Sequence, residues 1–269
     1  MSYMGIDVGG TKTLVALLSD DGVIEREEKF PTPERYQDFI VELEKVVVNF
    51  NSEYVKAVGI AVPGKVDPAT GVGLDFGNLT WEDIPIREDL EKMTGKPVVV
   101  DNDANLAGLS EAMLRPQYRK VLYVTVSTGI GTGYIVDQKV DFGMAESEGG
   151  HMLVEYDGKL VKWESFASGR AIVATYGKFA EDIHDDPTWR EVSHKIALGM
   201  IDLLALMQPD VVVLGGSVGT YFERYGDFLT EELTKLSSPL VPVPPIEKAG
   251  RPEKAVVYGC YDFAKAQYA

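Results

Sequence analysis

The sequence predicts an α/β protein built from two lobes, and three observations carry this prediction. Apolar runs of strand length alternate with amphipathic helical patterns along the chain. The 269 residues suffice for about two domains of ordinary size. A glycine turn that joins two apolar strands occurs at residues 7–12 and again at residues 127–133. This recurrence predicts a duplicated unit, one copy in each lobe.

The first lobe begins with a meander and then alternates between helices and strands. Thr32 can cap the first helix with Pro33 at its first position, and apolar residues then recur every three or four positions as far as Phe50. Gly95 is the expected C-cap of the second helix, because glycine readily adopts the left-handed conformation. The glycine-rich stretch at residues 63–81 is expected to be irregular. We expect strands at residues 2–7, 13–18, 23–30, 55–62 and 98–101, and helices at residues 33–50, 86–94 and 103–114.

The second lobe restarts with the same device, a strand, a glycine-rich turn and a returning strand. We place the boundary near Glu111, so that residues 1–111 form the N-terminal lobe and residues 112–255 the C-terminal lobe. Residues 256–269 could complete the first lobe. In the second lobe we expect strands at residues 121–127, 134–136 and 211–214, helices at residues 164–179, 191–207 and 221–236, a surface loop at residues 239–245, and a last strand and helix within residues 255–266.

Composition excludes several classes of protein. With 42 acidic against 26 basic side chains the net charge is −16, which argues against a nucleic-acid surface because such surfaces neutralise phosphates with Lys and Arg. The single cysteine, Cys260, allows no intramolecular disulfide and favours a reducing, cytoplasmic setting. Hydrophobic residues make up 45%, and the longest apolar runs fall well short of the ~20 residues that span a bilayer. We therefore expect a soluble globular protein with no membrane or nucleic-acid partner.

Two glycine turns are candidate phosphate-binding loops. In the first, Gly9 and Gly10 let phosphate oxygens approach backbone N–H groups, and Thr11 adds a hydroxyl donor. Lys12 can contact a phosphate, and Asp7 can bind a hydrated cation. The alternative is an ordinary hairpin turn, which Gly-Gly alone would favour.

The second turn has the same chemistry, with the hydroxyl of Thr128 beside Gly129 and Gly131. Its alternative is a flexible hairpin tip. Gly215 and Gly216 follow a buried strand and could lie against a base or ribose, although a structural turn is the more common reason for such a pair.

Polar residues elsewhere suggest an acid–base site and a hydroxyl-binding site. Asp103 opens a helix, whose dipole would keep its carboxylate ionised and able to accept a proton, although N-capping by Asp101 or Asp103 explains the spacing equally well. Glu148, His151 and Glu164 could grip vicinal hydroxyls, but a lone histidine beside glycines is more often a loop residue.

Taken in order, these motifs resemble the ROK family of sugar kinases (repressor, open reading frame, kinase), within the actin-like ATPase superfamily. The resemblance covers nearly the whole chain and implies an actin-like, ribonuclease H-like fold with a cleft between two lobes, and a homodimer or higher homo-oligomer. The motifs that carry it are Asp7-Val8-Gly9-Gly10-Thr11-Lys12, Ala61-Val62-Pro63-Gly64, Asn78-Leu79-Thr80-Trp81, Asn102-Asp103-Ala104-Asn105, Thr128-Gly129-Ile130-Gly131, Glu148-Gly149-Gly150-His151, Glu164 with Ala167-Ser168-Gly169, and Leu214-Gly215-Gly216.

The resemblance also implies roles for individual residues. Asp103 would be the catalytic base that accepts the proton of the attacking sugar hydroxyl, and Asp7 would hold Mg²⁺ through water. The implied sugar contacts are Gly64, Asn78, Asn102, Asp103, Glu148, His151 and Glu164. The implied ATP contacts are Asp7, Gly9, Gly10, Thr11, Lys12, Thr128, Gly129, Gly131, Gly215 and Gly216.

The chain departs from the family pattern where members usually carry zinc. Family members have a cysteine cluster between the positions of His151 and Glu164, whereas residues 152–163 contain no cysteine. We therefore expect ATP and Mg²⁺ as cofactors and no zinc, with packing around Tyr156 or Trp163 orienting His151 instead. Ser127 and Ser147 also stand where the family usually has glycine.

These observations predict an ATP-dependent sugar kinase. Glucose, phosphorylated at its 6-hydroxyl, is the first expectation for the substrate. N-acetylglucosamine, N-acetylmannosamine and fructose are the alternatives, because the same polar residues can hold all of them. A sugar-sensing regulator of the family is a non-enzyme alternative, although no DNA-binding helix-turn-helix precedes the first strand. An actin-like ATPase would not need the Glu148, His151 and Glu164 group.

Overall fold

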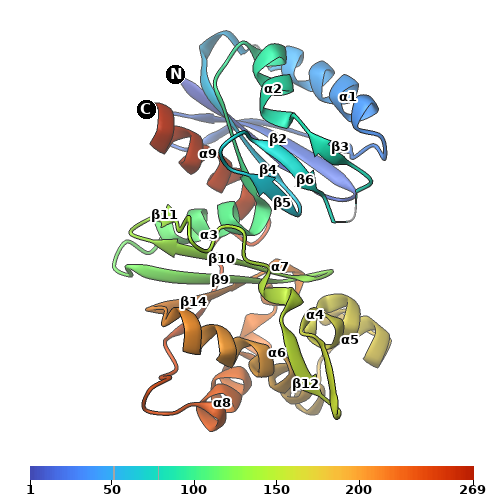
Figure 1. Cartoon of the computed structure of the whole chain (residues 1–269), viewed down its shortest axis with the longest axis vertical. Helices are drawn as coiled ribbons and strands as arrows, with labels where there is room; N and C mark the ends of the chain where they lie inside the picture. Colours follow the sequence, from blue (N-terminus) through green and yellow to red (C-terminus); the bar gives the residue numbers. More distant parts are fainter. Residues whose placement is uncertain (51, 78) are drawn as a thin grey trace. The chain divides into compact units, whose positions relative to one another are not determined.

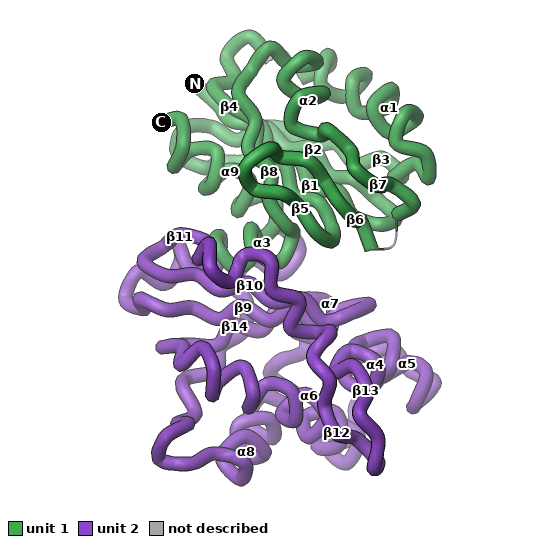
Figure 2. Tube along the Cα trace, viewed as in Figure 1, with its two compact units in different colours: residues 1–110, 254–269 green, residues 111–253 purple. Residues whose placement is uncertain are grey.

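The computed structural model describes residues 1–50, 52–77 and 79–269, and it divides into two compact units (Figure 2). Unit 1 comprises Met1–Ser110 and Lys254–Ala269, and unit 2 comprises Glu111–Glu253. Each unit contains a five-stranded mixed sheet with helices packed against it. The α/β class predicted from the sequence is confirmed.

The sheet of unit 1 joins an antiparallel meander to two parallel strands. Its strand order is β3-β2-β1-β4-β8, with β1–β2 and β2–β3 antiparallel and β1–β4 and β4–β8 parallel. The strands are β1 (Ser2–Val8), β2 (Lys12–Ser19), β3 (Ile24–Pro31), β4 (Val55–Val62) and β8 (Val98–Asn102). Because β1, β4 and β8 run in parallel, their carboxyl ends meet at one edge, where Asp7, Gly64 and Asn102 lie.

Helices cover both faces of this sheet (Figure 1). The helices α1 (Tyr36–Asn49) and α2 (Ile86–Thr94) bury their apolar residues against one face, and α9 (Ala255–Tyr268) packs on β1 and β4 from the other. Helix α3 (Asp103–Met113) follows β8 directly. Gly95 ends α2 in the left-handed conformation, as predicted.

Two expectations for unit 1 were wrong. Helix α1 begins at Tyr36 with Arg35 as its N-cap, so Thr32 does not cap it. The Thr32 hydroxyl instead donates to the Gly9 carbonyl (2.7 Å), a tertiary contact that overrides the local capping preference. Residues 63–81 were expected to be irregular, but β5 (Lys65–Asp67) and β6 (Val72–Asp75) lie within them and form a small antiparallel sheet with β7 (Glu82–Ile84).

The sheet of unit 2 repeats the topology of unit 1. Its order is β11-β10-β9-β14-β15, in which β11–β10 and β10–β9 are antiparallel and β9–β14 and β14–β15 are parallel. The strands are β9 (Lys120–Val126), β10 (Ile130–Val136), β11 (Lys139–Val140), β14 (Val211–Gly215) and β15 (Ile246–Lys248). The turn between β9 and β10 therefore corresponds to the turn between β1 and β2, which supports the predicted duplication.

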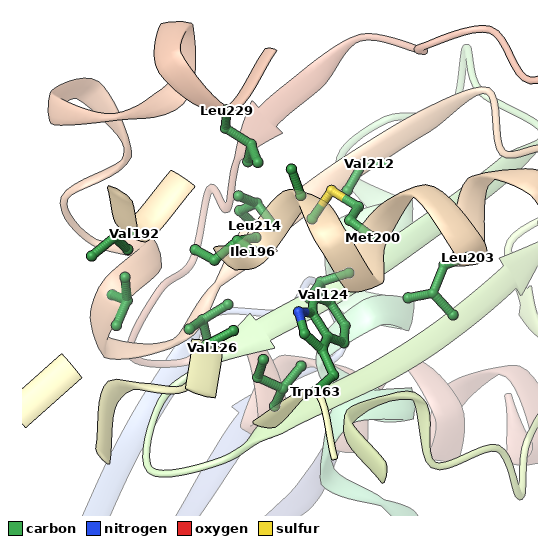
Figure 3. Packing of buried hydrophobic residues seen from close by; sticks show 14 of the residues in the cluster. Val124, Val126, Trp163, Val192, Ile196, Met200, Leu203, Val212, Leu214 and Leu229 are labelled. Carbon is green, nitrogen blue, oxygen red and sulfur yellow. The ribbon is translucent and has the colours of Figure 1, made fainter. Parts of the chain in front are cut away.

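One large core fills unit 2 (Figure 3). Its centre brings Trp163 together with Ile196 and Met200 of α6, and with Val124 and Leu214 of the sheet. The other elements are the hairpin β12 (Leu153–Tyr156) and β13 (Lys159–Lys162), and the helices α4 (Glu164–Ala167), α5 (Gly169–Tyr176), α6 (Asp186–Met207), α7 (Gly216–Gly219) and α8 (Gly226–Leu236). Single turns of 3-10 helix lie at Ser52–Tyr54, Gly149–His151, Ala180–Asp182 and Phe222–Arg224.

Several predicted bounds in the C-terminal half of the chain were wrong. The helix expected at residues 164–179 breaks at Ser168, whose hydroxyl caps α5 by accepting the Ala171 N–H. Helix α6 begins earlier than predicted, after the Asp185 cap, and α8 begins later, at Gly226. Residues from Ala255 onward are helical, so the last strand expected there is not formed. Across the described ranges, no helix is both long and apolar enough to cross a bilayer.

Candidate active site

The first glycine turn of unit 1 is a tight hairpin that leaves its tip exposed. The Gly9 N–H donates to the Lys12 carbonyl (3.0 Å), and Gly10, Thr11 and Lys12 are exposed to solvent. Thr32, the residue after β3, stabilises this turn with two hydrogen bonds. Its hydroxyl donates to the Gly9 carbonyl (2.7 Å), and its N–H donates to the Thr11 carbonyl (3.0 Å). The turn therefore presents backbone and side-chain donors from a fixed frame.

Two carboxylates lie near this turn in unit 1. Asp7 is close to the end of β1, and Asp103 is the first residue of α3. Burial and, to a smaller extent, the negative charge of Asp103 raise the pKa of Asp7 to about 7, and the positive charge of Lys29 opposes them. The electrostatic coupling places the two carboxyl groups in one environment.

Asn102 caps α3, and neither of the residues expected to do so, Asp101 and Asp103, is the N-cap. Its Oδ1 accepts the Ala104 N–H (2.8 Å), while its Nδ2 donates to the Gly64 carbonyl (2.8 Å). Gly64 has φ +82°, and a Cβ there would collide with the Asp75 carbonyl, so this position requires glycine. Neither aspartate is the N-cap residue, although Asp103 Oδ1 also accepts the Ala104 N–H (2.8 Å), and Asn102 and Asp103 are both held where β8 ends and α3 begins.

Asp101 holds Asn102 and Asn105 in place through hydrogen bonds, and it was not among the predicted site residues. Its Oδ1 accepts the Asn102 N–H (2.7 Å) and the Asn105 Nδ2 (2.8 Å), and burial raises its pKa. The predicted sugar contact Asn78 lies outside the described residues.

In unit 2 the structure brings Glu164 to both His151 and the second glycine turn. Glu164 Oε1 lies 3.3 Å from His151 Nε2, and its Oε2 accepts the Ile130 N–H (3.4 Å). A Cβ on Gly129 would lie only 2.6 Å from the same Oε2. Glu148 is exposed and joins His151 through the main chain, since its carbonyl accepts the His151 N–H (2.9 Å). The carboxylate of Glu164 thus links His151, a candidate hydroxyl-binding residue, to the second candidate phosphate-binding turn.

A cavity of about 890 Å³ in unit 2 joins the second turn to the glycine pair after β14. Thr128, Gly216 and Ser217 line one part of it, and Phe179 and Tyr221 contribute aromatic walls elsewhere. Its volume falls within the usual range for small-molecule sites, about 300–1,000 Å³. Hydroxyl and backbone donors beside aromatic walls suit a phosphorylated ligand with a flat ring system.

Three of the predicted nucleotide residues of unit 2, Gly129, Gly131 and Gly215, lie outside this lining. Gly131 is within β10, paired with Thr125, because β10 starts at Ile130 and shortens the turn. Gly215 ends β14 and is the N-cap of α7. The aromatic residues Phe179 and Tyr221 were missed by the sequence reasoning; their only signal was their proximity to helix ends near the glycine motifs.

The carboxylates of unit 1 fit a magnesium ion. Mg²⁺ is usually held by one or two carboxylates together with waters and substrate phosphates. Asp7 and Asp103 are such a pair. Burial, followed by the charge of Asp103, raises the pKa of Asp7, and a bound cation would favour the ionised form of both carboxyl groups. Within the described ranges no group of three or more His, Cys, Asp or Glu side chains is arranged to hold a metal by itself. The expected absence of zinc stays a prediction.

Comparison with known proteins identifies the family. The family model described as "ROK family" matches residues 3–267. The chain belongs to the ROK family. A glucokinase of Streptomyces coelicolor is 27% identical over 86% of each chain, and an N-acetyl-D-glucosamine kinase of Haemophilus influenzae is 27% identical over 96% of this chain and 97% of its own length.

A solved structure agrees with this assignment. The ROK family glucokinase from Streptomyces griseus, crystallised with glucose and AMPPNP, superposes with a TM-score of 0.84 at 27% identity and covers 99% of this chain and 100% of its own. This ROK protein therefore has the two-lobed actin-like ATPase fold that the sequence predicted.

Proposed function

We propose that this ROK protein transfers the γ-phosphoryl group of ATP to a hydroxyl of a hexose, with glucose and its 6-hydroxyl as the first choice. The protein is an ATP-dependent sugar kinase. The observation that carries the proposal is the end of β8, where Asn102 is fixed on the Gly64 carbonyl and presents Asp103 beside the buried Asp7.

Asp103 acts as the general base in this proposal. It accepts the proton of the attacking hydroxyl, which increases the electron density on that oxygen as it bonds to phosphorus. Asn102, Glu148, His151 and Glu164, with the backbone at Gly64, hold the remaining hydroxyls, and Asn78 joins them. Donors and acceptors that fix the sugar raise the rate chiefly by orienting the reacting oxygen.

The glycine turns hold the nucleotide. Gly9, Gly10, Thr11 and Lys12 offer donors to the phosphates, as do Thr128 and Gly129 of the second turn, with Gly131 in the strand that follows. Gly215 and Gly216 flank the adenosine, and Asp7 holds Mg²⁺ through water. When bound, Mg²⁺ supplies positive charge that neutralises the phosphate oxygens.

Replacing Asp103 tests the mechanism. Asp103→Asn keeps the shape of the side chain but removes the base, so kcat should fall by about 10²- to 10⁴-fold while sugar binding is largely retained. Asp38→Asn, an exposed change on α1, is the matched control and should leave kcat unchanged. Near-normal turnover by Asp103→Asn would refute the assignment.

A coupled assay of ADP release over a panel of hexoses and N-acetylhexosamines identifies the substrate. A kcat/KM for glucose above that for N-acetylglucosamine, N-acetylmannosamine and fructose supports the first choice, and the reverse order selects an alternative. Sugar binding without ADP release would favour a sugar-sensing regulator. ADP release that no sugar stimulates would favour an ATPase. Gel filtration with light scattering tests the proposed homodimer or higher homo-oligomer.

A further inference from the structure

We propose that Lys195 of α6 is a positioning residue for Glu164, and through Glu164 for sugar binding. The inference rests on the proposed function, because it concerns the residues assigned there to the sugar hydroxyls. It identifies what orients the Glu164–His151 pair within unit 2.

Lys195 is an unusually buried cation. Its side chain is only 5% exposed, and its ammonium lies 3.0 Å from Glu191 Oε1 and donates to the Tyr176 hydroxyl (3.1 Å). The ammonium also faces the rings of Tyr156 (5.9 Å to the centroid) and Tyr176 (4.9 Å). Burial by itself lowers the pKa of Lys195, but the hydrogen bonds with Tyr176 and Glu191 outweigh it, so the residue is charged.

Two series of contacts connect Lys195 to the residues that flank Glu164. The first is the main chain, because the Lys195 carbonyl accepts the indole N–H of Trp163 (3.2 Å), the residue immediately before Glu164. The second passes through the Tyr156 ring, which stacks on Phe166 with centroids 4.3 Å apart and planes at 1°. Phe166 lies two residues after Glu164 in α4. The residues on both sides of Glu164 are therefore held from one position of α6.

The packing of the Trp163 side chain against α6 leaves it little freedom to move. Figure 3 shows Trp163 within the core beside α6, and Gly199 of that helix lies directly against the indole, where a Cβ would collide with the ring. Trp163 also donates its backbone N–H to the Met152 carbonyl (2.9 Å), next to His151. This frame fixes both partners of the Glu164–His151 contact (3.3 Å).

Lys195, Glu191, Tyr176 and Tyr156 form what we call the Lys195 cluster. This cluster holds the orientation of α4, which so short a helix cannot maintain alone. Helix α4 has only four residues, Glu164–Ala167, so its own hydrogen bonds do little to define its axis. A change of tilt would move Glu164 Oε1 away from His151 and Oε2 away from the Ile130 N–H (3.4 Å). Loss of the Lys195 cluster should therefore weaken sugar binding more than nucleotide binding.

The test compares Lys195→Met with a matched control on the same helix. Ser193→Ala also removes a buried hydrogen bond of α6, from the Ser193 hydroxyl to the Tyr225 carbonyl (3.3 Å), but it touches neither Trp163 nor Tyr156. We expect Lys195→Met to raise KM about tenfold or more for the hexose that the wild-type enzyme uses best, with KM for ATP within about threefold. Ser193→Ala should leave both values unchanged, and Lys195→Arg should restore part of the loss.

Tyr156→Leu keeps the test decisive if Lys195→Met does not fold. It removes the ring that links Lys195 to Phe166 while the Glu191 and Tyr176 partners remain, so it should also raise KM for the sugar. Unchanged sugar KM in a folded Lys195→Met or Tyr156→Leu variant would overturn the inference, as would an equal rise for Ser193→Ala.

A second measurement separates this inference from the proposed function. The chain has three histidines, so the imidazole signal of His151 can be assigned by NMR. We expect Tyr156→Leu to shift this signal and Ser193→Ala to leave it in place. If the wild-type protein phosphorylates no sugar, the proposed function fails, and the His151 signal alone then decides whether the cluster orients the pair. An unshifted signal would overturn the inference.

Discussion

Gly129→Ala should impair sugar use although Gly129 belongs to a turn that we propose binds phosphate. The added Cβ would lie 2.6 Å from Glu164 Oε2, whereas ordinary contact begins at 3.4 Å. The carboxylate must therefore retreat by about 0.8 Å. Its hydrogen bond from the Ile130 N–H is already long (3.4 Å), so this movement breaks it. The contact with His151 Nε2 (3.3 Å) is displaced at the same time.

The size of the effect follows from the bonds lost. Hydrogen bonds to charged groups contribute about 1.5–3 kcal/mol, which corresponds to a fall of about 10- to 150-fold in kcat/KM for the sugar. Initial rates with sugar varied at saturating ATP measure this value. Gly143→Ala is the control, because its Cβ would meet only Asp141 Oδ1 at 3.1 Å, and it should be near neutral.

A double-mutant cycle can refute this reasoning. If Gly129→Ala acts by displacing Glu164, it should cost little further activity in a Glu164→Ala background. Fully additive losses would show that the alanine acts elsewhere, for example on the phosphates. A change in KM for ATP alone would lead to the same conclusion.

Three further predictions concern stability, the first turn and metal content. Thr32→Val removes the brace on Gly9, so KM for ATP should rise about fivefold or more, as measured by initial rates with ATP varied; an unchanged value would show that the turn holds itself. Glu111→Gln weakens the ion pair (2.6 Å) between the fully buried Glu111 carboxylate and Arg115, whose side chain is 10% exposed, and should lower the free energy of unfolding in urea by about 3 kcal/mol. The exposed change Glu88→Gln should cost less than about 1 kcal/mol, and equal losses would contradict the distinction. Mass spectrometry of the purified protein should find no stoichiometric zinc, and one bound zinc per chain would contradict this expectation.

Strong local patterns predicted much of the fold. The strands β1, β2 and β4 and the helix α2 follow the pattern of apolar residues closely, and Gly95 ends α2 in the expected conformation. Prediction failed where a distant partner decides the outcome. Thr32 suits a helix cap, yet it bonds to Gly9 from 23 residues away. The break at Ser168 has a local cause instead, because the Ser168 hydroxyl accepts the Ala171 N–H, and the spacing of apolar residues gives no sign of such a cap.

The residues of the candidate site were likewise predicted only where local sequence or motif order identifies them. The glycine turns could be nominated from residue type and spacing, whereas Gly64 and the role of Asp103 were implied by the resemblance to the ROK family. The cap on α3 was left open between Asp101 and Asp103, and neither provides it. Asn102 does, since its amide can reach the Gly64 carbonyl only when β4 and β8 lie side by side.

By itself the sequence determined the α/β class and the two glycine turns, and it nominated the polar residues that we propose for a sugar kinase site, because these depend on residue type and spacing. Only the tertiary structure decided how Glu164 is oriented. Its contacts with His151 and Ile130, and the Lys195 cluster behind it, join residues that are 13 to 34 positions apart from it or its neighbours. Such contacts leave no periodic signal in the chain, since they arise from the packing of one element on another.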